Sequence, residues 1–168
     1  VQESVNFALK NGYKTIVFDS LTRYAEVLMD DILAKNNKIT AQIQHWGELV
    51  TRIKKMMWVL QAQNINTIFT CLEKETDEGD QLIKRPSLNG QLVQAIPAIV
   101  DVTGYLYATQ TSERLLSINP TDKWYAKHRT ILANKIDEDL IPDFMILSER
   151  IFGIEQDVVE QNILEKVA

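Results

Sequence analysis

Residues 13–22 read Tyr-Lys-Thr-Ile-Val-Phe-Asp-Ser-Leu-Thr, a short apolar segment that ends at an acidic residue, Asp19. An apolar run of this length is typical of a strand that is buried on both faces of a parallel sheet. Parallel α/β sheets bind their ligands at the carboxyl ends of the strands. A carboxylate there can hold Mg²⁺, directly or through water, beside nucleotide phosphates. We therefore predict that Asp19 binds a metal ion; the alternative is that Asp19 or Ser20 caps the helix that follows.

The bulk composition favours one globular domain over residues 1–168. Of these 168 residues, 45% are hydrophobic and 24% are charged, and the formal net charge is -5. This charge argues against a broadly basic surface, so any contact with nucleic acid has to be local. The lone cysteine, Cys71, excludes an internal disulfide and favours a reducing cytoplasm. No apolar run approaches the ~20 residues that cross a bilayer, so we expect no membrane partner.

The order of the apolar segments predicts an α/β fold. The first half is predicted to contain a helix over 1–10, a strand over 14–18, a helix from about 21 to a polar stretch at 35–40, a helix along 46–60 and a strand over 65–72. A polar, mobile loop over 73–89 follows, and then a helix over 90–96 that Pro97 ends. The second half is predicted to contain strands over 99–109, 114–118 and 129–133, a helix from 142 or 143 to 153, and an acid-rich amphipathic helix over 154–167. The last two form a C-terminal helical segment, 142–168. We expect a sheet that is parallel in its first half, with an antiparallel extension and helices on both faces.

Glu73 ends the second predicted strand as Asp19 ends the first. If the two strands are neighbours, the two carboxylates lie side by side and could orient a metal-bound water. The alternative is a solvated loop acid, because Glu73 opens an acidic run over 73–80 and charge runs usually face solvent. We keep Glu73 as a candidate catalytic residue.

Residues 127–129 carry two cations, two positions apart. Lys127 and Arg129 flank a histidine and, on a strand, point to one face, so both could reach one phosphate group. The alternative for this pair is the charged outer face of an edge strand.

Residues 84–90 end the predicted loop with a second group of polar and cationic side chains. Lys84 and Arg85 could contact a nucleic-acid backbone, Asn89 could add a hydrogen bond, and Gly90 would allow close approach of the main chain. The alternative is an ordinary helix start with its capping groups. These residues are the candidate nucleic-acid contacts.

Two phosphate-binding motifs are excluded, and the signals for a zinc site are weak. No glycine of the chain stands five residues before a Gly-Lys pair, so there is no P-loop motif, and no Gly-x-Gly-x-x-Gly is present. His45, His128 and Cys71 are isolated in the sequence, without the spacing of a zinc site.

Taken in order, five segments resemble the RecA-like P-loop NTPase core from its Walker B strand onward. They are similar to phage RecA-like nucleotide-binding proteins, some of which act in single-strand annealing recombination. The matching segments are residues 13–22, 66–74, 85–92, 96–106 and 126–129. The resemblance implies an ATP-binding protein of DNA recombination that uses ATP and Mg²⁺, with single-stranded DNA as a partner.

The resemblance also implies roles for individual residues. Asp19 takes the place of the Walker B acid near Mg²⁺, with Ser20 beside it at the nucleotide site. Glu73 falls near the position that senses the γ-phosphate, which is often Gln, and residues 75–90 correspond to the second DNA-binding loop. Lys127 and Arg129 match paired cations that reach a neighbour's ATP, which implies a homo-oligomer.

The largest departure from the family pattern is the missing P-loop. A P-loop strand and helix precede the first helix of this chain in the family, so we expect the sequence to be an N-terminally incomplete RecA-like domain. Without them the phosphates lack a nest of backbone N–H groups and the P-loop lysine. One alternative is a non-catalytic RecA-like module for oligomerisation or DNA binding, and another is a generic α/β domain in which Asp19 caps a helix. A phage-encoded protein would work in the bacterial host cytoplasm.

Overall fold

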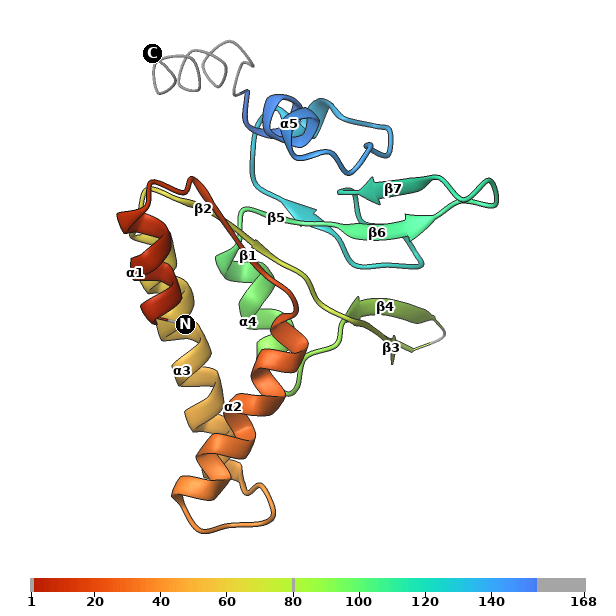
Figure 1. Cartoon of the computed structure of the whole chain (residues 1–168). Helices are drawn as coiled ribbons and strands as arrows, with labels where there is room; N and C mark the ends of the chain where they lie inside the picture. The colour runs from red at the N-terminus through yellow and green to blue at the C-terminus, as the bar shows by residue number, and fades with distance from the viewer. Residues whose placement is uncertain (1, 80, 154–168) are drawn as a thin grey trace. The chain divides into compact units, whose positions relative to one another are not determined.

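The computed structural model describes residues 2–79 and 81–153. The chain divides into two compact units, which we describe separately. Unit 1 comprises Val1–Glu75 and Arg85–Ile99, and unit 2 comprises Thr76–Lys84 and Val100–Ala168. Helices and small two-stranded sheets make up a mixed α/β structure (Figure 1). The α/β class is thus confirmed, whereas the single domain over 1–168 stays a prediction.

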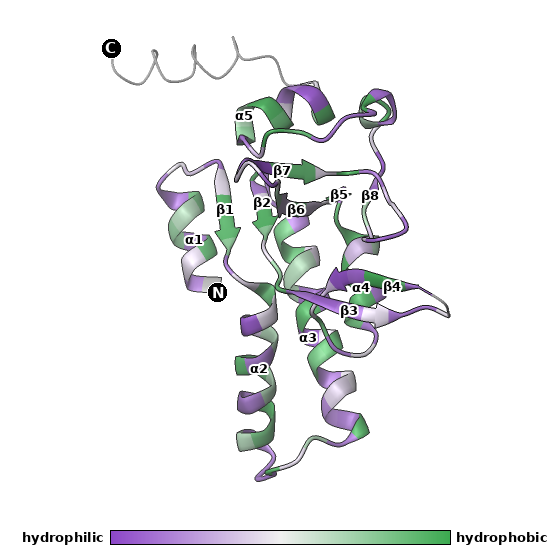
Figure 2. Ribbon diagram, turned by 90° about the vertical axis from the view of Figure 1, so that its right-hand side faces the viewer, coloured by the Kyte–Doolittle hydropathy of each residue, from purple (hydrophilic) through white to green (hydrophobic). Residues whose placement is uncertain are grey.

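Unit 1 contains the strand with which the sequence analysis began. Strand β1 (Thr15–Phe18) pairs in parallel with β2 (Asn66–Phe69), in a register that places Phe18 opposite Phe69. Strand β1 carries mainly hydrophobic residues, and β2 begins with two polar residues and ends with two hydrophobic ones (Figure 2). The helices are α1 (Gln2–Lys10), α2 (Leu21–Lys35), α3 (Ile43–Gln61) and α4 (Leu92–Ile99). The predicted parallel pairing in the first half of the chain is confirmed.

Helices α2 and α3 lie side by side and supply most of the buried core of unit 1 (Figure 1). Their buried apolar residues recur every three or four positions, so each helix has one continuous apolar stripe. These residues are Leu21, Ala25, Met29 and Ile32 of α2, and Leu49, Ile53, Met57 and Leu60 of α3. At the solvent side Asp31 Oδ2 accepts from both Lys35 Nζ and Arg52 Nη1, at 2.8 and 3.2 Å, and so links the two helices.

The polar stretch after β2 is not the long loop that the sequence predicts. Strand β3 (Glu73–Asp77) and strand β4 (Leu82–Pro86) form a two-stranded sheet. Along β3 the exposed acids Glu73, Glu75 and Asp77 alternate with the half-buried Lys74 and Thr76. An alternation with a period of two is typical of a strand. Here the exposed positions are all acidic, so the sequence of this segment resembles that of a solvated loop. Helix α4 also differs from its prediction, because it continues through Pro97 to Ile99.

Unit 2 consists of short antiparallel pairs and a small helical layer. Strand β5 (Val102–Thr103) pairs with β8 (Lys127–His128), and β6 (Tyr105–Ala108) pairs with β7 (Arg114–Ser117). The antiparallel character of the second half is confirmed, but a single continuous RecA-like sheet is not shown. The strand predicted over 129–133 is wrong: β8 precedes it, and a 3-10 helix, η1 (Ala133–Lys135), follows.

Gly104 divides the predicted strand 99–109 into β5 and β6. A Cβ atom at this position would stand 2.8 Å from Leu116 Cδ1 and 3.1 Å from the Ser117 carbonyl oxygen of β7. Glycine inside a strand often marks such a close approach of a neighbouring strand. Glycine at this position therefore leaves room for β7, a neighbour that the sequence of 99–109 alone does not show.

The helical layer of unit 2 begins at Asp143, as predicted. The Asp143 carboxylate accepts hydrogen bonds from the backbone N–H groups of Met145 and Ile146, and so caps α5 (Phe144–Leu147). The helix continues as a π-helical turn, η2 (Ser148–Phe152), and ends at Gly153 with φ +70°. The helix predicted over 154–167 lies outside the described residues. Within the described parts, no helix has the length and hydropathy needed to cross a bilayer.

Candidate functional site

The carboxyl ends of β1 and β2 bring Asp19 and Thr70 into contact. Asp19 directly follows β1, and Thr70 directly follows β2. The Thr70 hydroxyl donates to Asp19 Oδ1 at 2.6 Å, and the Thr70 N–H donates to the Phe18 carbonyl at 3.0 Å. The Asp19–Ser20 peptide bond is cis. Both polar side chains are exposed, so the sheet edge presents an oriented carboxylate to solvent.

Ser20, and not Asp19, caps the helix that follows. The Ser20 hydroxyl oxygen accepts from the backbone N–H of Arg23 at 3.3 Å, and Ser20 has the extended backbone of an N-cap residue. The capping alternative is therefore confirmed for Ser20. The side chain of Asp19 is directed to Thr70 instead, so helix capping does not explain the acid at this position.

A hollow of about 420 Å³ opens beside β1 and includes the candidate acid. Its polar lining residues are Ser4, Asp19, Ser20 and Arg23, from α1, the β1–α2 junction and the first turn of α2. Its apolar lining residues are Val5, Ile16, Val17, Phe18, Tyr24 and Val27. Val17 is 57% exposed, which is high for an apolar residue in the middle of a strand. A mixed hollow of this kind suits a ligand with one polar and one apolar end.

Asp19 fits a Mg²⁺ ion of the kind that travels with nucleotide phosphates. Such ions keep several waters and need one or two protein carboxylates, the other ligands being phosphate oxygens. Asp19 Oδ1 is oriented by Thr70, and Oδ2 remains for an ion or its water. Among residues 2–79 and 81–153 no group of three or more His, Cys, Asp and Glu could hold a metal ion by protein ligands alone. A Mg²⁺ ion would therefore depend on its phosphate partner.

Glu73 does not end the second strand. Strand β2 ends at Phe69, and the residue opposite Asp19 is Thr70. The expectation of two carboxylates side by side is therefore wrong, because the structure pairs a carboxylate with a hydroxyl. Glu73 begins β3, where its side chain is exposed. Its catalytic role stays a prediction, without the strand-end placement that suggested it.

The candidate nucleic-acid residues differ in how available their side chains are. Lys84 is half-buried in unit 2, and its Nζ donates to the Tyr105 hydroxyl at 3.0 Å. Arg85 is half-buried in unit 1. Asn89 and Gly90 are exposed in the turn before α4, where the Asn89 carbonyl accepts from the N–H of Leu92 at 3.2 Å. Asn89 therefore takes part in the start of α4, as the alternative interpretation expects. Binding of nucleic acid by the four candidate residues stays a prediction.

Lys127 lies on β8 of unit 2, and Arg129 directly follows that strand. Lys127 pairs with Thr103 in the register of that ladder. The Arg129 N–H donates to the Asp101 carbonyl at 3.1 Å, and Arg129 Nη2 donates to the Val100 carbonyl at 2.9 Å. Arg129 Nε stands 3.8 Å from Asp101 Oδ1. The Arg129 side chain is thus held beside β5, and action on a neighbour's nucleotide stays a prediction.

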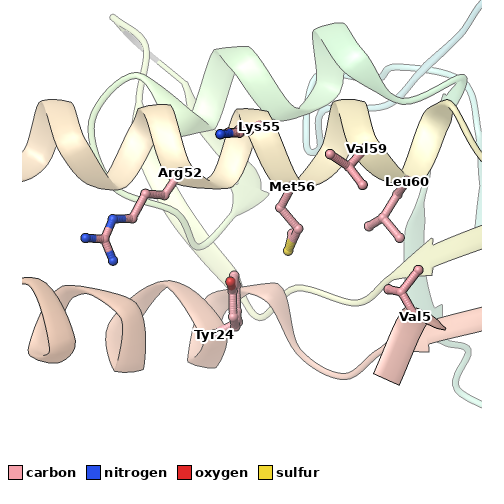
Figure 3. Close-up of a pocket in the computed structure, with 7 residues that line it drawn as sticks. All are labelled: Val5, Tyr24, Arg52, Lys55, Met56, Val59 and Leu60. Atoms are coloured by element: carbon pink, nitrogen blue, oxygen red, sulfur yellow. The ribbon is translucent and has the colours of Figure 1, made fainter. Parts of the chain in front are cut away.

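A second hollow of unit 1, of about 290 Å³, lies between α2 and α3 (Figure 3). Tyr24 extends from α2 toward Met56 of α3, and Arg52 lies at one end (Figure 3). Arg52 already contacts Asp31 at 3.2 Å and Glu48 at 2.5 Å. No carboxylate stands among the residues that line this hollow, so it is a weaker candidate for a phosphate that carries a metal ion than the hollow beside Asp19.

Replacing Thr70 by Val is expected to weaken Mg²⁺ binding at Asp19 by roughly 10- to 100-fold, the usual effect of removing a hydrogen-bond partner of a metal ligand. Valine keeps the size of the side chain but cannot donate to Asp19. The measurement is the Mg²⁺ concentration that half-saturates binding in the presence of a nucleoside triphosphate. Thr70→Ser retains the hydroxyl and should behave like the wild type. An unchanged Mg²⁺ requirement in Thr70→Val would contradict the orienting role.

The segment after Thr70 is held to the first turn of α2. The N–H of Leu72 donates to the Thr22 hydroxyl at 3.1 Å, and the Leu72 carbonyl accepts from the N–H of Ser87 at 2.6 Å. Cys71 lies between Thr70 and Leu72 and is half-buried. Burial raises the pKa of the Cys71 thiol from 9.0 to about 11, against a smaller lowering by a hydrogen bond with Thr22.

Cys71 is therefore expected to react slowly with thiol reagents in the folded chain. The thiolate is the nucleophile, so the folded thiol should react about 100-fold more slowly near pH ~8 than the thiol of the urea-unfolded chain. The folded state holds the proton of the Cys71 thiol more tightly than the unfolded chain does. The contribution of this thiol to the free energy of unfolding is therefore fully present below pH 9.0 and is lost as the pH rises towards about 11. Reaction with a chromogenic disulfide checks the rates. Equal rates for folded and unfolded chain would contradict the buried thiol.

An acid and a hydroxyl at the carboxyl edge of a parallel strand pair, in a mixed α/β structure, are typical of P-loop NTPase-like cores. The chain belongs to the AAA domain family, which matches residues 4–130. This membership indicates a P-loop NTPase-like ATPase function, with nucleotide and Mg²⁺ use in general. No curated protein and no solved structure matches the chain.

Proposed function

We propose that the chain is an ATP-binding RecA-like core that acts in DNA recombination or single-strand annealing, in the manner of phage RecA-like proteins. The observation that carries the proposal is the Asp19–Thr70 contact at the carboxyl edge of β1 and β2. Family membership over residues 4–130 supports the ATPase part. The order of the matching segments from 13–22 to 126–129 supports the RecA-like part.

Asp19 would hold the metal ion, and Thr70 keeps its carboxylate in one orientation. When bound, Mg²⁺ supplies charge neutralisation on the phosphates. Ser20 fixes the start of α2, so that the chain direction after Asp19 does not vary. Lys127 and Arg129 are proposed to act on the nucleotide of a neighbouring copy, which makes the working form a homo-oligomer.

Single-stranded DNA is the proposed partner, with Lys84, Arg85, Asn89 and Gly90 as its contacts. Gly90 has φ +55°, and a Cβ atom there would meet nothing within 4 Å, so the turn is open to an approaching ligand. Binding through the two cations predicts an affinity that falls as salt rises.

The test is ATP turnover by the protein as its gene encodes it, with and without single-stranded DNA. The proposal expects Mg²⁺-dependent turnover that single-stranded DNA stimulates. A second candidate is a non-catalytic RecA-like module, which the absence of a P-loop motif from the 168 residues favours. Salt-sensitive DNA binding without turnover would select that candidate, and the absence of both would reject the two proposals together.

A further inference from the structure

Arg23 is a cation that the sequence does not mark as functional. It lies in the first turn of α2, and its backbone N–H donates to the Ser20 hydroxyl oxygen at 3.3 Å. This bond fixes Arg23 one helical turn after the capping residue. Arg23 lines the same hollow as Asp19 and Ser20. Asp19 and Arg23 are the charged residues of that lining, with opposite signs.

We propose that Arg23 binds a phosphate group of a nucleoside triphosphate whose Mg²⁺ ion is held by Asp19. The inference rests on the proposed function and names a phosphate-binding residue for it. A phosphate beside a carboxylate needs compensating positive charge, because two anions at close range repel. Arg23 is the cation among the residues that line the hollow with Asp19. In the hollow beside β1, Arg23 meets that need.

The guanidinium of Arg23 is available for a second acidic partner. Its side chain is 72% exposed, and Nη1 donates to Glu26 Oε2 at 2.8 Å. The hydrogen bond with Glu26 raises the pKa of Arg23, so the guanidinium stays charged. A guanidinium carries five N–H donors in a planar fork that matches phosphate oxygens. The contact with Glu26 uses Nη1, so the N–H groups of Nη2 and Nε can donate to a phosphate.

The apolar side of the hollow indicates which end of the ligand lies away from Arg23. Val17 of β1 and Val27 of α2 are 57% and 50% exposed and line the hollow with Tyr24. Such surfaces suit the flat apolar face of a base, whereas Ser4, Ser20 and Arg23 suit ribose and phosphate. The ligand class is therefore a nucleoside phosphate.

The experiment compares MgATP and adenosine binding by calorimetry, in the protein as its gene encodes it. Arg23→Gln should weaken MgATP binding about tenfold or more, the usual effect of losing a charge-assisted hydrogen bond. It should leave adenosine binding unchanged, because adenosine carries no phosphate, and Arg23→Lys should fall between. The matched control is Lys35→Gln, which removes another exposed, acid-paired cation of α2, one that does not line the hollow.

Each outcome bears on one proposal or on both. Wild-type MgATP affinity in Arg23→Gln would overturn the role of Arg23 and leave the proposed function standing. An equal loss in Arg23→Gln and Lys35→Gln, or an equal loss for adenosine and MgATP, would also overturn it, because the effect would then be general. A wild-type protein that does not bind MgATP would overturn the proposed function together with this inference.

Discussion

Replacing Asp19 by Asn should lower MgATP turnover on the order of 100- to 1000-fold, because a metal ion supplies several kcal/mol of charge stabilisation and each ~1.4 kcal/mol is tenfold in rate. Asparagine keeps the shape of the side chain and can still accept a hydrogen bond from Thr70. It removes the negative charge that holds Mg²⁺ beside the phosphates. The fold should therefore survive, while the metal-dependent step is lost.

The measurement is steady-state ATP turnover at saturating Mg²⁺, with thermal unfolding of each variant as a check on folding. Asp122→Asn is the matched control, since Asp122 is an exposed acid of unit 2. It should retain wild-type turnover. Wild-type turnover in Asp19→Asn would mean that this acid does not hold the metal ion, and the assignment of Asp19 as the metal ligand would then be wrong.

The strand–helix junction that carries Asp19 could be predicted because local sequence determines it. An apolar run and a polar pair, followed by apolar residues at helical spacing, correspond to β1, the Asp19–Ser20 junction and α2. What local sequence leaves open is which of two good capping residues does the capping. The structure decides this through a residue far along the chain, since Thr70 engages Asp19 and leaves the cap to Ser20.

Thr70 was not predicted because the apolar run continues past the end of its strand. Cys71 and Leu72 extend the pattern and hide the boundary after Phe69. A signal was nevertheless present: both strands end in phenylalanine followed by a polar residue, as Phe18-Asp19 and Phe69-Thr70. Two parallel strands with equal endings place those polar residues opposite each other. The contact between Asp19 and Thr70 depends on the pairing of β1 with β2, which the pattern of residues along the chain does not contain.

Arg23 and the β3–β4 sheet show the same limit in other ways. Arg23 sits in a helical stretch where an exposed cation followed by Glu26 is a common surface pair. Its candidate role depends on sharing a hollow with Asp19, which is a three-dimensional fact. The β3–β4 sheet was missed because charged residues occupy the exposed positions of β3, so that no apolar alternation marks the strand.

Ile53→Ala is expected to destabilise unit 1 by ~2–5 kcal/mol, the range for removing a large buried aliphatic side chain. Ile53 lies in the middle of α3 and is 0% exposed. Alanine at this position loses the apolar contacts with the core and leaves a cavity that the packed helices fill only in part. Urea unfolding followed by helical circular dichroism measures the loss as a lower midpoint with an unchanged slope.

Ile43→Ala provides a matched control, because it is the same substitution in the same helix. Ile43 begins α3 and is 91% exposed, so its replacement should change the free energy of unfolding by no more than ~0.5 kcal/mol. The difference between the two variants then reports burial alone, since the residue types and the helix are shared. Similar losses at both positions would show that the apolar stripe of α3 does not form the core of unit 1. The edge formed by Asp19 and Thr70 would then lack the packed helices that we take to support it.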